Sequence, residues 1–261
     1  MNATAQPTSE FRLPAIRDIG GEAPWQWLAK GWRDIGRHPF LSLGYGLVFT
    51  LACHGVAALL YRFNMLALAL PMAAAVVFAG PLLAVGLYEL SRRIGTGEEV
   101  SLGRIAFVRT GAPTQIAFMA LALVLFALAW IRIATLLFAL FFGDSTQPLD
   151  QLMRTLLLTF DGISFLAVGT LIGAGLSFLA FTISAVSIPR LVDTDTDAIS
   201  AIATSVMAVR KNFWPMVLWA WLIGVLTAVG IATLFIGFIV IFPLVGHASW
   251  HAYRALVTDK A

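Results

Sequence analysis

The chain has 261 residues, of which 59% are hydrophobic and only 12% are charged, with a formal net charge of +3. Soluble domains carry roughly 25% charged residues, so this composition excludes an ordinary soluble enzyme and favours a membrane protein. Cys53 is the single cysteine, which excludes an internal disulfide and a cysteine-based metal site.

A polar segment opens the chain. Residues 1–22 contain no apolar stretch of the kind found in a cleaved signal peptide, and we expect them to form a disordered or extended tail. We interpret residues 23–258 as one membrane domain, because most of it lies in apolar runs of about 20 residues, the length that crosses a bilayer. The sequence therefore predicts an all-α, polytopic fold with six transmembrane helices, at Pro39–Tyr61, Met65–Glu89, Thr114–Phe142, Ile163–Leu191, Phe213–Gly230 and Thr233–Tyr253.

An amphipathic segment precedes the first apolar run. Residues 24–37 carry Trp25, Leu28, Trp32 and Ile35 at helical spacing, with basic residues between them. Tryptophans beside basic residues are typical of a helix that lies in the headgroup region of a membrane.

Residues 195–211 repeat this apolar spacing before the fifth run, and residues 101–109 form a shorter version before the third. On the opposite side of the bundle, apolar residues at helical spacing in 149–160 predict another amphipathic helix.

The positions of lysine and arginine indicate the orientation. With the N-terminus in the cytoplasm, most basic residues of the loops and tails lie inside, whereas Arg62 and Arg154 lie outside and Arg132 lies within the third span. Because basic residues are retained on the cytoplasmic side, we expect both termini and the three surface helices of 24–37, 101–109 and 195–211 to be cytoplasmic.

One motif occurs twice. A proline, an aromatic residue seven positions later and an arginine eleven positions later appear as Pro81, Tyr88 and Arg92 and again as Pro243, Trp250 and Arg254. We therefore predict an internal parallel duplication, with repeat one at 24–93, a weaker middle hairpin at 100–191 and repeat two at 195–255. Each unit is an in-out-in hairpin, and we expect the two clear repeats to be related by a roughly twofold rotation about the membrane normal.

Three runs resemble an uncharacterised bacterial family of integral membrane proteins, domain of unknown function 2189: Ser187–Asp193, Asn212–Ala220 and Pro243–Arg254. The resemblance extends from about Trp25 to Val257 and implies the bacterial inner membrane. The family has no assigned activity. Some members bear the label of cytochrome c oxidase subunit I, which needs six histidine ligands, whereas this chain has four histidines. The oxidase interpretation therefore fails on ligand number.

The histidines allow a smaller hypothesis. His247 and His251 are four residues apart on one helical face, a spacing that suits a metal, and His54 lies within the first span. The alternative is that these imidazoles hydrogen-bond between helices or to headgroups. We expect no cofactor, and His54, His247 and His251 remain weak metal or haem candidates.

Arg132 and two glycines are further candidates. A charge inside a span is costly and often functional; its possible partners are Asp161 and Asp144, and the alternative is a side chain that reaches towards the outer surface. Gly169 and Gly173 are spaced for close helix packing, either within the bundle or against a partner chain.

The two aromatic–arginine pairs of the repeated motif predict lipid or anion binding. Tyr88 and Arg92, and likewise Trp250 and Arg254, are four residues apart at the cytoplasmic boundary, where anionic headgroups lie. The alternative is that they form only an aromatic and basic boundary belt.

The chain contains no recognisable catalytic motif, so we do not expect an enzyme. We favour a non-catalytic accessory, scaffold or lipid-interacting envelope protein, and a small transporter or channel is the alternative. A haem-binding membrane protein is a third. Membrane lipids are the expected partners, with another membrane protein or a second copy of the chain as further possibilities, and nucleic acid is not expected.

Overall fold

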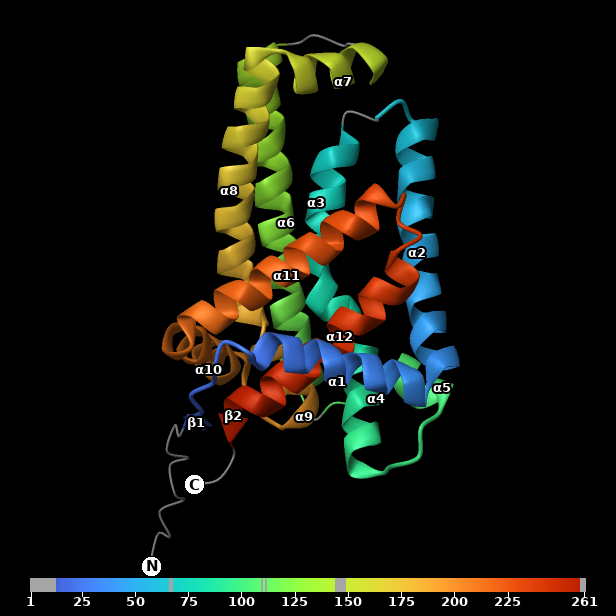
Figure 1. Cartoon of the computed structure of the whole chain (residues 1–261), viewed down its shortest axis with the longest axis vertical. Coiled ribbons are helices and arrows are strands. Elements are labelled where there is room, and N and C mark those ends of the chain that lie inside the picture. Colours follow the sequence, from blue (N-terminus) through green and yellow to red (C-terminus); the bar gives the residue numbers. More distant parts are fainter. Residues whose placement is uncertain (1–12, 66–67, 109, 111, 144–148, 259–261) are drawn as a thin grey trace, which may run out of the picture.

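The computed structural model describes residues 13–65, 68–108, 110, 112–143 and 149–258. Helices dominate this part of the chain, and two short strands pair near its ends (Figure 1). The elements are β1 (Ala15–Ile16), α1 (Ala23–Arg37), α2 (Pro39–Arg62), α3 (Ala69–Leu83), α4 (Val85–Thr96), α5 (Leu102–Ala106), α6 (Pro113–Phe142), α7 (Leu149–Leu158), α8 (Phe160–Ser184), α9 (Ser187–Asp193), α10 (Ala198–Lys211), α11 (Phe213–Ala232), α12 (Phe238–Leu256) and β2 (Val257–Thr258).

Local sequence signals set several helix ends. Prolines occupy the first turn of α1, α2 and α6, where a missing backbone N–H costs nothing. The side chains of Thr159 and Asp197 cap α8 and α10 by accepting backbone hydrogen bonds. Gly97 ends α4 with a φ of 73°, a left-handed conformation that glycine adopts without steric cost.

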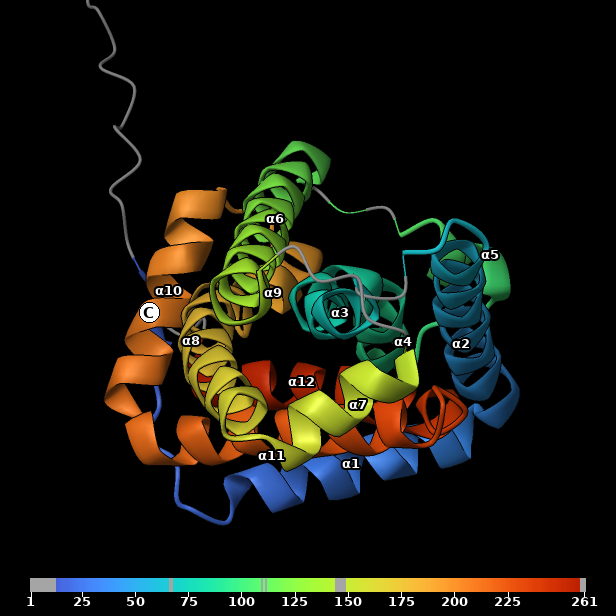
Figure 2. The ribbon, with the colours of Figure 1, turned by 90° about the horizontal axis from the view of Figure 1, so that it is seen from above.

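Helices α2, α3, α6 and α8 stand along the long axis of the molecule (Figure 1). Seen along that axis, α3 lies between α2 on one side and α6 and α8 on the other (Figure 2). Within the described residues, four helical segments are long and apolar enough to cross a membrane: Pro39–Arg62, Pro113–Phe142, Phe160–Asp193 and Phe213–Ala232. The protein is thus a helical membrane protein, and these segments match four of the six predicted spans.

The other two predicted spans take a different form. Helix α3 has 15 residues and is followed by α4 after a break at Ala84, three residues beyond Pro81. Helix α12 contains Pro243 and carries two histidines and an arginine in its second half. Together, α11 and α12 form a hairpin that crosses the bundle obliquely, in contrast to the upright α2, α6 and α8 (Figure 1).

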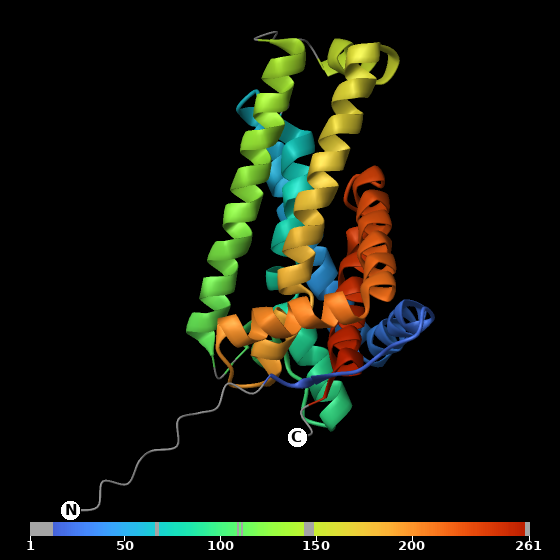
Figure 3. The ribbon, with the colours of Figure 1, turned by 90° about the vertical axis from the view of Figure 1, so that its left-hand side faces the viewer.

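The amphipathic segments form helices, as predicted. Helices α1, α5 and α10 all lie at the end of the bundle where both ends of the described chain meet, and α7 lies across the opposite end (Figures 1 and 3). Around the first end, large apolar side chains on or next to these helices are exposed. We call this set the apolar collar: Trp25, Trp32, Leu102, Phe107, Ile199 and Trp214.

The apolar stripe predicted for residues 24–37 does not form a single face. The side of α1 against the bundle carries Trp27, Gly31 and Asp34, all buried, whereas Trp25 and Trp32 are 51% and 58% exposed. The helix therefore has two apolar sides: one packs against the rest of the protein, and the other is exposed on the protein surface.

The strands tie the two ends of the described chain together. Strand β1 pairs with β2 in antiparallel register, and the amide of Asn212 donates to the carbonyl of Arg17 at 2.9 Å. Residues 1–12 of the predicted tail lie outside the described residues, while residues 15–16 are extended and paired.

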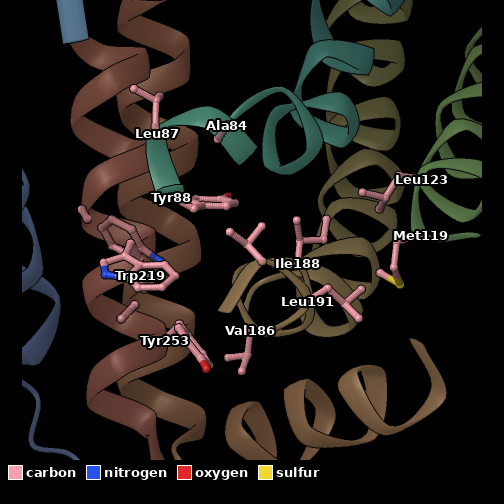
Figure 4. Close-up of a cluster of buried hydrophobic side chains, with 14 of the residues drawn as sticks. Ala84, Leu87, Tyr88, Met119, Leu123, Val186, Ile188, Leu191, Trp219 and Tyr253 are labelled. Carbon is pink, nitrogen blue, oxygen red and sulfur yellow. The ribbon is translucent and has the colours of Figure 1, made fainter. Parts of the chain in front are cut away.

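The core lies where α4, α9 and α12 contact one another in pairs. Leu87 and Tyr88 from α4, Ile188 and Leu191 from α9, and Tyr253 from α12 are all buried there (Figure 4). Around it, α1 packs on α12, α5 on α4, and α10 on α8 and α9.

Candidate functional site

Glycines let α12 approach three neighbouring helices closely. A Cβ at Gly31 of α1 would lie 2.9 Å from the backbone nitrogen of Ala248, and a Cβ at Gly46 of α2 would collide with the carbonyl oxygen of Ile239. On α12 itself, Gly246 packs against Leu87 of α4. Side chains on the faces next to these glycines are therefore brought within hydrogen-bonding distance.

Five polar side chains from these four helices form one hydrogen-bonded chain. Ser42 Oγ lies 3.0 Å from His247 Nε2, and Ser91 Oγ lies 2.7 Å from His247 Nδ1. The Ser91 hydroxyl donates to Asp34 Oδ2 at 2.8 Å, and His251 Nε2 lies 2.8 Å from the same oxygen. We call this chain, Ser42–His247–Ser91–Asp34–His251, the polar network.

The geometry assigns the proton positions within the polar network. Since Ser91 uses its one proton on Asp34, the 2.7 Å contact requires His247 Nδ1–H to donate to Ser91. His247 Nε2 is then an acceptor and receives the hydroxyl proton of Ser42. A neutral His247 in this tautomer satisfies every polar atom of its side chain.

The polar network is closed to the surroundings. Ser42, Ser91, Asp34 and His247 are all buried, and only His251 is partly exposed. Burial alone would raise the pKa of Asp34, but the hydrogen bonds from His251 and Ser91, with the nearby imidazoles, lower its pKa below the ordinary value of 3.8. The network therefore holds α1 against α2, α4 and α12.

An ion cluster lies next to the network at the end of α4. Glu89 is buried and accepts from Arg92 Nε at 2.7 Å and from Arg93 Nε at 2.6 Å. Arg92 also donates to Glu98 at 2.8 Å, and this hydrogen bond lowers the pKa of Glu98. A buried carboxylate is tolerated here because two guanidinium groups neutralise it.

The predicted lipid-binding pairs sit in unlike surroundings. Tyr88 is buried in the core and Arg92 belongs to the ion cluster, so the guanidinium of this pair is already matched by carboxylates. Trp250 is buried against Tyr253, with ring centroids 5.4 Å apart. Arg254 donates to Asp193 at 2.8 Å, yet its side chain is 55% exposed. Of the four residues, Arg254 is therefore the one placed to meet a headgroup.

The three histidine candidates do not meet. His247 and His251 both join the polar network, whereas His54 Nδ1–H donates to the carbonyl of Thr50 at 3.0 Å and its ring packs edge-on against Phe235. Among the described residues, no three His, Cys, Asp or Glu side chains are grouped to hold a metal ion. The hydrogen-bonding alternative for His247 and His251 matches the geometry.

Arg132 lies on the exposed face of α6, where no described residue forms an ion pair with it. Of its predicted partners, Asp144 lies outside the described residues and Asp161 is exposed at the start of α8. Gly173 packs against the ring of Trp130 on α6, as close packing requires, whereas a Cβ at Gly169 would meet nothing within 4 Å.

No motif or spacing in the sequence groups Asp34, Ser42 and Ser91. The one signal available was an aspartate within an otherwise basic amphipathic segment, on the same helical face as Gly31 and Trp27. An acidic residue on a packed face needs a buried donor, and that requirement points to a polar partner on a neighbouring helix.

Fold and composition together define a polytopic, mostly helical membrane protein with surface helices at one end. Residues 68–193 match the model of a family described as predicted integral membrane protein (DUF2189), which confirms the resemblance over that part of the chain. The Pro243–Arg254 motif lies outside the matched residues, and the match does not support the oxidase label. No curated protein and no solved structure matches the chain.

Proposed function

We propose that this chain is a non-catalytic protein of the bacterial inner membrane that associates with the lipids of the cytoplasmic leaflet, as an accessory, scaffold or envelope protein. The observation that carries the proposal is the apolar collar. Exposed tryptophans on helices that lie across the bundle end, with Lys30, Arg33 and Arg37 on the same helix, have the composition of an interfacial membrane-binding surface.

In this proposal the chain crosses the membrane six times, with α3 and α4 acting as one pass and the oblique α11–α12 hairpin providing two. The presence of both described ends on one side of the bundle agrees with an even number of passes. The basic residues of α1, α4, α5 and α10 lie on that side too, which favours the cytoplasm. Duplication of the α1–α4 and α10–α12 segments remains part of the proposal.

A non-catalytic role fits the polar network, because its serines and His247 are buried and fully hydrogen-bonded to one another. A network of this kind stabilises the position of α1, and α1 carries Trp25 and Trp32 of the collar. A second copy of the chain or another membrane protein is a compatible partner at the exposed faces.

The alternative, a small transporter or channel, would draw support from a polar path through the bundle. The described residues offer instead an internal space between α3, α8 and α11 that is lined mostly by apolar side chains and by no charged one. The haem-binding alternative would need His54 to join His247 or His251, and these side chains have separate partners. Both observations favour the lipid-associated role.

Native mass spectrometry of the protein released from anionic nanodiscs tests the proposal. Replacing Arg33 and Arg37 together with glutamine removes two exposed charges next to the collar and should reduce retained anionic lipid several-fold, since one basic contact at such a surface contributes about 1 kcal/mol. Arg154→Gln, an exposed arginine on α7 at the opposite end, is the matched control. Equal retention by all three proteins would refute lipid association through this end.

A further inference from the structure

Two adjoining cavities lie inside the bundle. The inner cavity, of about 110 Å³, is lined by residues of α2, α3, α4, α6, α8, α11 and α12, and the outer one, of about 800 Å³, lies between α3, α6, α8 and α11. Val77, Phe78, Ser177, Phe181 and Ile223 line both, so the two spaces meet at these side chains.

The outer cavity opens sideways, towards the bilayer. Its walls include Trp221 of α11, which is 61% exposed, and residues 165–181 of α8, and α8 and α11 scarcely contact each other. Those α8 residues extend over roughly 24 Å at 1.5 Å per residue, more than the ~15 Å of one leaflet's hydrocarbon. A hydrocarbon chain of ordinary lipid length fits the space.

Hydroxyl groups line the inner cavity without protein partners. Tyr88 is 3% exposed and lines this cavity, and no described residue hydrogen-bonds its hydroxyl. Figure 4 shows its ring extending from α4 towards Ile188 of α9. Ser177, Thr227 and Ser249 also line the cavity, and among the described residues their hydroxyls have no partner either.

The Tyr88 side chain lines the inner cavity and no described residue accepts its hydroxyl proton, so a ligand that supplies an acceptor there would gain a hydrogen bond. Neither cavity has a charged side chain among its described lining residues, which excludes a phosphate or another ionised group as that acceptor. A neutral carbonyl oxygen at the end of an apolar chain meets both conditions.

We propose that the cavities bind a long hydrocarbon chain that carries a carbonyl oxygen near one end, with the carbonyl accepting a hydrogen bond from Tyr88 and the chain occupying the space between α8 and α11. This inference rests on the proposed lipid association and names its binding site. The size of the inner cavity argues for a linear group, because a 150 Å³ apolar cavity is what holds a benzene ring and about 110 Å³ is smaller. The carbonyl has two sources, the protonated carboxyl group of a long-chain fatty acid and the ester of a glycerolipid.

Two variants test the site: one fills the outer cavity, and the other removes the hydroxyl group of Tyr88. Gly169→Leu with Gly224→Leu fills the outer cavity from both walls, and a Cβ at either position meets nothing within 4 Å, so the helices need not move. Gly175→Leu is the matched control, since it adds the same side chain to α8 at an exposed position that also has nothing within 4 Å and does not line the cavity. Tyr88→Phe keeps the ring and removes only the unpaired hydroxyl.

The assay uses nanodiscs of diether phospholipids, which contain no ester carbonyl, and a photoreactive palmitic acid whose crosslinks are mapped by peptide mass spectrometry. We expect saturable crosslinking to α8 and α11 in the wild-type protein and in Gly175→Leu. Crosslinking should fall at least tenfold in the Gly169→Leu/Gly224→Leu protein. Tyr88→Phe should weaken binding about fivefold, the effect of one neutral hydrogen bond.

A second arm replaces the acid with an ester-linked phosphatidylcholine that bears the same photoreactive chain. Saturable labelling by only one probe identifies the source of the carbonyl. Labelling by neither, or equal labelling of all variants on outward faces, would overturn the proposed site. Anionic-lipid retention at the collar is measured separately and does not depend on the cavity variants, so failure of the site is distinguishable from failure of the proposed function.

Discussion

Gly46→Ala should separate α2 from α12 and destabilise the protein. The added Cβ collides with the carbonyl oxygen of Ile239, and it would also lie 2.8 Å from that carbonyl carbon. Ser42 lies one turn before Gly46 on the same face and bonds His247, and Thr50 one turn after it donates to Phe235 O at 3.3 Å. Moving α2 outwards therefore strains a packed contact and lengthens two hydrogen bonds.

The loss of unfolding free energy can be estimated from the packed contact and the hydrogen bonds. Overpacking a core contact costs about 1–3 kcal/mol, and loss of a buried hydrogen bond adds about 1 kcal/mol. Alanine gains about 1 kcal/mol over glycine in helix propensity, so the expected net loss is about 1–3 kcal/mol. Gly44→Ala is the control: it has the same propensity gain on the same helix, and its Cβ meets nothing within 4 Å.

Reversible unfolding in mixed micelles of a mild detergent and dodecyl sulfate, followed by tryptophan fluorescence, measures the free energy of unfolding for both variants. The control should be as stable as the wild type or more so, and the two variants should differ by about 2–4 kcal/mol. Equal unfolding free energies for Gly46→Ala and Gly44→Ala would refute the close approach of α2 and α12.

Three further outcomes are expected. Asp34→Asn should cost about 1–3 kcal/mol in the same unfolding assay, because a neutral amide oxygen accepts from Ser91 and His251 more weakly than a carboxylate oxygen does, and the amide NH2 would face the Arg37 guanidinium. Asp18→Asn, at a largely exposed position, should change stability little. Because the pKa of Asp34 in the folded protein lies below its ordinary 3.8, its contribution is complete above about pH 3.8 and is lost as pH falls through the folded value. This acid-dependent loss should be absent from Asp34→Asn, and an unchanged acid profile would refute the assignment. Reporter fusions should place the C-terminus in the cytoplasm, whereas an external reporter signal there would reverse the proposed orientation.

Much of the secondary structure was predictable because its signals are local. Proline in a first turn and Asp197 before an amphipathic run indicate α1 and α10 directly. Orientation of the oblique α11–α12 hairpin was not predictable, since the length of an apolar run limits whether a helix can cross a bilayer but does not set its tilt. Packing against α1 and α2 decides that tilt.

The polar network could not be read from spacing, because its members come from four helices distant in sequence. Only the glycine contacts at Gly31, Gly46 and Gly246 bring these helices close enough for Asp34 and His247 to share Ser91. The pair of histidines on α12 was visible as an i, i+4 pattern, yet the pattern alone does not distinguish a metal site from hydrogen bonding. Their partners decide in favour of hydrogen bonding.

Measuring how deep the side chains of the apolar collar lie in the membrane tests the proposed function most directly. Spin labels are attached at Trp32→Cys on α1 and at Ile199→Cys on α10, in a Cys53→Ala background, and the protein is placed in nanodiscs. The accessibility of each label to oxygen, relative to its accessibility to an aqueous nickel complex, measures how deep that position lies in the membrane. We predict that both labels lie about 5–10 Å into the boundary between headgroups and acyl chains, while a label at Glu98, in the loop after α4, is exposed to water. Water-like accessibility at both Trp32 and Ile199 would contradict the account, because the collar would then not meet the membrane.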